Sequence, residues 1–116
     1  MFKWVTYYVN DLDKSIEFYK NIIGLEIDRK ISPSDEMEIA FLGKGQTKVE
    51  LIGSSEVKTP DLGESISLGF EVDSIEKFID KNNIKDFEGP IKPNPHIKFI
   101  YIKDPNGLKI QLIENL

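Results

Sequence analysis

Few residues of this chain carry side chains suited to acid–base, nucleophilic or metal chemistry. Cysteine is absent, which excludes disulfides, thiolate metal sites and a cysteine nucleophile. His96 is the only histidine and ends the proline-rich stretch EGPIKPNPH, where a histidine usually faces solvent. Ser67 has no identifiable base beside it, and Arg29, the only arginine, could reach an anionic group. These residues therefore predict no catalytic constellation.

Strand alternation groups a second set of side chains on one face. In KVELI, Lys48 and Glu50 point away from their apolar neighbours, because successive strand residues face opposite sides. The same rule sets three further groups apart: Trp4, Thr6 and Tyr8; Ser67, Gly69 and Glu71; Lys109 and Gln111. Trp4, joined by Tyr8 or Tyr101, would give a wall for stacking a flat ligand, and Glu50 would give it a charge. The alternatives are plain packing of Trp4 and a solvated or lysine-paired Glu50.

The first half of the chain predicts a strand, a helix and three more strands. Apolar alternation in WVTYYV is typical of a half-buried strand, and Asp11 follows at a helix N-cap position. Gly24 is the expected C-cap. One face of the helix would carry four apolar residues: Leu12, Ile16, Tyr19 and Ile23. Strands are expected at 25–30, 37–42 and 47–52, separated by the turn sequences SPSDE and GKGQ.

The same signals return after the polar connector GSSEVKTPDLGES. Apolar alternation reappears 63 residues after the first strand, in three residues: Leu68, Phe70 and Val72. Asp73 or Ser74 is the expected cap of a second helix, and Glu76, three residues after Asp73, predicts a capping box. The apolar face of this helix would carry Ile75, Phe78 and Ile79. EGPIKPNPH is predicted as a loop with at most a vestigial strand, before a hairpin of 97–103 and 108–113 closed by DPNG.

This repeated order predicts a duplicated unit, each copy reading strand, helix and three strands. A chance similarity within an ordinary α+β domain is the alternative, but the cap, the helix face and the strand alternation recur in one register. We expect one domain over residues 1–116, with module one at about 1–53, a connector at about 54–64 and module two at about 65–116.

Four stretches together resemble the vicinal oxygen chelate superfamily: YYVNDLDKSIEFYKNIIGLEI, KVELI, GFEVDSIEKF and DPNGLKIQLIE. That family includes glyoxalase I, extradiol dioxygenases and bleomycin-resistance proteins, and the resemblance covers nearly the whole chain in the right order. It implies an α+β fold in which two βαβββ modules form curved mixed sheets around a cup, with the helices on the convex side. It implies less about activity, because one scaffold hosts many functions.

The resemblance also implies where metal-using members hold their ion, with four His or Glu ligands on the first and last strands of each module. Those positions fall on Trp4, Glu50, Ser67 and Gln111. Only Glu50 matches, and a catalytic zinc, nickel or iron site needs about three protein ligands. We therefore expect no cofactor, and Glu50 is the best candidate for any catalytic role.

Charge and composition limit the partners. The net charge is −5, from 15 basic and 20 acidic residues, which argues against nucleic acid and anionic membranes. No apolar run approaches the roughly 20 residues of a membrane-spanning helix. The N-terminal stretch lacks the features of a signal peptide, so we expect a cytoplasmic protein. Open sheet edges and the resemblance predict a homodimer.

The sequence thus predicts a protein that binds a flat small organic molecule in the cup without a metal. Trp4, Tyr8, Tyr101, Ser67 and Gln111 would line the cup around Glu50. An enzyme of the glyoxalase kind, a metal-dependent lyase or isomerase with a substituted site, is the first alternative. A non-catalytic scaffold whose cup is filled by side chains is the second. The residues leave open whether the protein is an enzyme.

Overall fold

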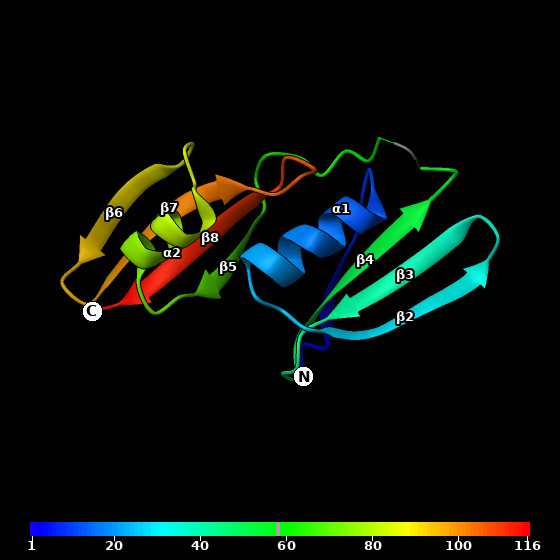
Figure 1. Cartoon of the computed structure of the whole chain (residues 1–116), viewed down its shortest axis with the longest axis horizontal. Coiled ribbons are helices and arrows are strands. Elements are labelled where there is room, and N and C mark those ends of the chain that lie inside the picture. Colours follow the sequence, from blue (N-terminus) through cyan, green and yellow to red (C-terminus); the bar gives the residue numbers. More distant parts are fainter. Residues whose placement is uncertain (58) are drawn as a thin grey trace. The chain divides into compact units, whose positions relative to one another are not determined.

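The computed structural model describes residues 1–57 and 59–116, so residue 58 of the predicted connector lies outside the described residues. The chain forms two compact units, Met1–Leu62 and Gly63–Leu116, and each holds one βαβββ module with its own four-stranded mixed sheet. In each module a helix lies along one face of the sheet (Figure 1). The predicted α+β class and the two-module order are confirmed.

Module one carries all four predicted strands. Its elements are β1 (Trp4–Tyr8), α1 (Leu12–Glu17), the short π-helix η1 (Phe18–Ile22), β2 (Ile27–Ser34), β3 (Met37–Leu42) and β4 (Lys48–Ser54). The strand order is β1-β4-β3-β2, with β1 parallel to β4 and the other neighbours antiparallel. β3 has the predicted bounds, whereas β2 begins two residues later than predicted and ends four residues later.

Local sequence explains where the helical segment of module one begins and ends. Asp11 has an extended backbone, and its side chain accepts a hydrogen bond from the Lys14 amide at 3.1 Å, as an N-cap does. Gly24 ends the segment with φ at +92°, a conformation that glycine adopts without strain. Ile16 and Tyr19 are buried against the sheet. The Tyr19 ring meets the Tyr7 ring edge-on, with centroids 6.3 Å apart, so η1 is packed onto β1.

Module two repeats this plan. Its elements are β5 (Ser67–Glu71), α2 (Ile75–Asn82), β6 (Glu88–Asn94), β7 (Ile97–Lys103) and β8 (Lys109–Asn115). The strand order is β5-β8-β7-β6, with β5 parallel to β8. The closing hairpin occurs as predicted, around a turn that Asp104 organises. This buried carboxylate accepts hydrogen bonds from the amides of Asn106 and Leu108, both at 2.8 Å.

The prediction of a loop at EGPIKPNPH was wrong. Residues Glu88–Asn94 form β6, which pairs antiparallel with β7. This strand lies at the edge of the sheet, is exposed throughout and has two register shifts. An edge position tolerates Pro90 and Pro93, because a residue without an amide hydrogen need not donate to a second neighbour.

Of the two predicted caps of the second helix, Asp73 and Ser74, the structure has Ser74, so the capping box predicted at Asp73 was wrong. Ser74 is the N-cap of α2, and its hydroxyl accepts a hydrogen bond from the Lys77 amide at 3.1 Å. The amide of Ile75 instead donates to Glu114 on β8, at 2.7 Å. A carboxylate from a distant strand therefore satisfies a free amide of the first turn, which a local sequence pattern cannot show.

Candidate functional site

The side of each sheet opposite its helix, here called the helix-free face, carries the candidate site residues. In module one, Val49 and Leu51 of β4 are buried under α1, while Glu50 between them is half-buried on the other face. Trp4 and Tyr8 lie on the same face as Glu50, because the β1–β4 register pairs Trp4 with Lys48 and Tyr8 with Ile52.

A single register row crosses all four strands of module one through Glu50. Thr6 pairs with Glu50, Glu50 with Phe41, and Phe41 with Arg29. The Thr6 hydroxyl donates a hydrogen bond to Oε1 of Glu50. Within the described part of the chain, this hydroxyl is the only side chain that hydrogen-bonds or ion-pairs with the Glu50 carboxylate. The charge of Glu50 is therefore oriented but not neutralised.

Phe41 is the buried floor of this face. The indole of Trp4 meets the Phe41 ring edge-on, with centroids 5.3 Å apart and planes at 69°. Because β4 lies between β1 and β3, the indole leans over β4 beside Glu50. Phe41 is only 3% exposed, whereas Trp4 is 40% exposed and leaves surface for a ligand. Tyr8 packs on the cluster of Ile39, Phe41 and Ile52, so it supports the wall.

Arg29 covers Phe41 from the edge strand. Its guanidinium carbon lies 4.5 Å from the centroid of the Phe41 ring, a cation–π contact. No carboxylate among residues 1–57 and 59–116 forms an ion pair with it. The positive charge therefore lies on the same face as Glu50, held in place by an aromatic ring.

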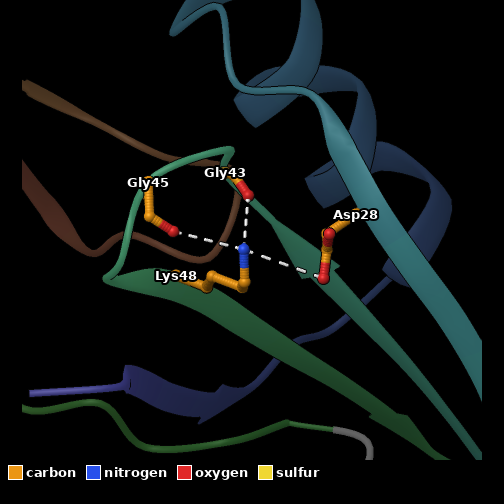
Figure 2. Close-up of polar contacts among 4 residues, drawn as sticks. All are labelled: Asp28, Gly43, Gly45 and Lys48. Carbon is orange, nitrogen blue, oxygen red and sulfur yellow. Dashed lines mark hydrogen bonds and ion pairs between the residues drawn. The ribbon is translucent and has the colours of Figure 1, made fainter.

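Lys48 does not neutralise Glu50, although the sequence allowed that pairing. Its Nζ donates to the carbonyl oxygens of Gly43 at 3.0 Å and Gly45 at 3.3 Å, and it lies 3.8 Å from a carboxylate oxygen of Asp28 (Figure 2). This ammonium group is thus bound to the β3–β4 turn. Figure 2 shows the lysine directed between the turn and β2.

The remaining candidates lie on the helix-free face of module two. The β5–β8–β7 register makes one row of Gly69, Gln111 and Tyr101. Ser67 is exposed and pairs with Lys109, whose Nζ lies 4.6 Å from the centroid of the Tyr101 ring. Each module therefore gathers its own candidates: Trp4, Tyr8 and Glu50 in module one, and Ser67, Tyr101 and Gln111 in module two.

The two registers make the candidate positions equivalent. Trp4 pairs with Lys48, which is two residues before Glu50 on β4. Ser67 pairs with Lys109, which is two residues before Gln111 on β8.

His96 lies outside these rows, exposed in the turn between β6 and β7. Sequence reasoning placed Thr6 on the right face without giving it a role, and it missed Phe41. Alternation sorts faces, but only the register shows which residues on one face are neighbours.

The donor set does not fit a tightly held metal. At the four positions where the resemblance implies ligands, the side chains are an indole, a carboxylate, a hydroxyl and an amide, of which only the Glu50 carboxylate is an ordinary ligand. Across the described residues, no three His, Asp or Glu side chains are grouped so that they could hold an ion. These four positions offer one carboxylate, Glu50, and one aromatic surface, Trp4.

Comparison with known proteins defines the class. A family model described as Glyoxalase/Bleomycin resistance protein/Dioxygenase superfamily matches residues 2–112, and the chain belongs to this superfamily. Among curated proteins, it is 35% identical over 117 residues to a probable lactoylglutathione lyase from Synechocystis sp., covering 91% of this chain and 88% of the relative.

Solved structures share the fold. A glyoxalase I mutant from Zea mays matches with a TM-score of 0.82 and 27% identity, over 97% of this chain and 44% of the maize chain. An antibiotic-binding protein from Streptomyces sp. CB03234 matches with a TM-score of 0.75 and 18% identity, over 100% and 96% of the two chains, which shows the fold alone. In the described part of this protein, no helix is long and apolar enough to cross a membrane.

Proposed function

We propose that this protein binds a flat small organic molecule on the helix-free face of module one, without a tightly held metal. One observation carries the proposal: Glu50 keeps its carboxylate, while an exposed indole, Trp4, stands beside it where the resemblance implies a metal ligand. A planar ligand would stack on the exposed surface of Trp4. Its polar end would meet Glu50, which Thr6 orients.

Electrostatics favour a ligand with a cationic group at the Glu50 end. A cation over the indole contributes roughly 0.5–2 kcal/mol, depending on how far it is desolvated. A carboxylate that forms no ion pair within the described residues adds a charge-assisted partner for the same cation. The expected ligand therefore has an aromatic plane and a basic group beside it.

The fluorescence of Trp4 tests this proposal, since Trp4 is the only tryptophan. Titration with cationic aromatic compounds should change the emission saturably, and Glu50→Gln should weaken binding roughly 5- to 10-fold. Glu38→Gln is the matched control, because Glu38 lies on the adjacent strand β3, on the other face, and pairs with Lys30 at 3.5 Å. Equal affinities for Glu50→Gln and Glu38→Gln would overturn the role of Glu50.

A metal-dependent lyase is the second candidate, and the similarity to a probable lactoylglutathione lyase favours it. Metal analysis of protein purified without chelator separates the two. We expect less than one divalent ion per chain and no lactoylglutathione lyase activity after nickel or zinc is added. One tightly bound nickel or zinc ion with activity would replace our proposal with this one.

The expected homodimer stays a prediction. An isoleucine side chain is exposed on one edge strand of each sheet, Ile31 on β2 at 42% and Ile91 on β6 at 40%. Apolar edges of this kind are normally paired or covered. Sedimentation at micromolar concentration should give a dimer mass, and a monomer would contradict the prediction.

A further inference from the structure

A register shift in β2 decides which charge lies opposite Phe41. Ile27 pairs with Leu42, and continuing that antiparallel register would place residue 28, Asp28, opposite residue 41. The shift between Ile27 and Arg29 instead places Arg29 there. Asp28 lies 3.8 Å from Lys48 at the β3–β4 turn. The register shift therefore places Arg29 on the row that contains Glu50, whereas Asp28 forms its ion pair with Lys48.

The row then carries opposite charges at a fixed spacing. Glu50 and Arg29 are separated by Phe41 alone, so their backbones are two strand spacings apart, roughly 10 Å. Neither charge is neutralised by an ion pair within the described residues. Both are held in place, Glu50 by the Thr6 hydroxyl and Arg29 by the Phe41 ring. A single planar molecule that spans Phe41 could reach both groups.

We infer that the ligand of this face is amphoteric: a flat molecule with a cationic group at Glu50 and a carboxylate or similar anion at Arg29. The inference rests on the proposed function and adds that the ligand carries an anionic group, which Arg29 binds. The guanidinium is a planar donor that suits bidentate binding of a carboxylate. The Phe41 ring accepts no conventional hydrogen bond from the guanidinium, whose five N–H donors include the pair that a carboxylate binds.

Matched aromatic probes test the inference on the whole chain of 116 residues. They are benzylamine, benzoate, para-(aminomethyl)benzoate and the biphenyl analogue of the last compound, whose charges lie further apart. The single indole N–H signal of Trp4 in a proton–nitrogen correlation spectrum reports binding at this face. We expect the better-fitting amphoteric probe to bind about 10-fold more tightly than benzylamine.

Variants assign the two ends of the probe. Arg29→Gln should remove the advantage of the amphoteric probe and leave benzylamine affinity within about twofold, whereas Arg29→Lys should keep part of it. Lys30→Gln is the matched control, since it removes the same charge from the next residue of β2, which faces the other side and pairs with Glu38. Glu50→Gln should weaken benzylamine and the amphoteric probes alike.

The outcomes separate this inference from the proposed function. Equal binding of benzylamine and the amphoteric probes, or no difference between Arg29→Gln and Lys30→Gln, would overturn the anionic end and leave a cation-binding site in place. If no probe moves the Trp4 signal while a wider set of flat compounds also fails, both the inference and the proposed function are wrong.

Discussion

In module one, a row of side chains crosses the helix-free face as hydroxyl, carboxylate, phenyl ring and guanidinium: Thr6, Glu50, Phe41 and Arg29. The equivalent row of module two begins with a glycine and continues with an amide, a phenol and a carboxylate. Its residues are Gly69, Gln111, Tyr101 and Glu88. The backbone pairing is the same, yet the ionised groups of module one are neutral or of opposite sign in module two. The two modules thus share backbone positions and not side-chain chemistry.

The two equivalent lysines show the same divergence. Lys48 donates to two carbonyl oxygens of its own turn, and its side chain is 23% exposed. Lys109 lies over the Tyr101 ring and 3.9 Å from Glu88, with its side chain 39% exposed. The turns explain the difference, because GKGQ offers carbonyl oxygens to the lysine, whereas DPNG is organised by the Asp104 carboxylate. Loop chemistry therefore decides whether the lysine occupies the helix-free face.

The largest expected effect concerns the two turns. Asp104→Ala should lower the free energy of unfolding by about 3 kcal/mol, because it removes the acceptor of the buried Leu108 amide and of the partly buried Asn106 amide. Gln46→Ala, in the exposed turn of module one, should change it by less than about 0.5 kcal/mol. Urea unfolding measures both, and a loss below 1 kcal/mol for Asp104→Ala would show that the turn of module two does not depend on this carboxylate.

A smaller effect distinguishes the lysines. Lys48→Met should destabilise the protein by about 1 kcal/mol, since it removes two charge-assisted hydrogen bonds that are partly shielded from water. Lys109→Met should cost less than about 0.5 kcal/mol, because its partner Glu88 is largely exposed. Asp28→Asn tests whether the carbonyl bonds rather than the ion pair hold Lys48, and should also change little. Similar losses for Lys48→Met and Lys109→Met, measured by urea unfolding, would remove the contrast between them.

The smallest effect tests whether module two accepts a residue of module one. Gly69 stands where module one has Thr6, and a Cβ there would lie 3.2 Å from Cδ1 of Ile113 and 3.4 Å from Oε1 of Gln111. The first atom is the end of a flexible side chain and can move by a few tenths of an ångström. Gly69→Thr should therefore stabilise module two by about 0.5 kcal/mol, through higher strand propensity. Thermal unfolding that shows a clear loss instead would mean that this row is too tightly packed to be exchanged.

The sequence determined the parts of the structure that depend on local patterns. Asp11 and Gly24 mark the helical segment of module one because capping and left-handed backbone are properties of single residues. Period-two alternation placed Trp4 and Glu50 on one face. The positions where the resemblance implies metal ligands could also be located, because the motifs around them are recognisable in the sequence.

Tertiary structure decided which of these residues are neighbours. The shift in β2 put Arg29, and not Asp28, opposite Phe41, and Glu114 reached the first turn of α2 from a distant strand. Residues Glu88–Asn94 became a strand despite their prolines, because an edge position requires hydrogen bonds to only one neighbour. Register, edge position and long-range capping arise from pairing between segments far apart in the chain, so no local pattern contains them.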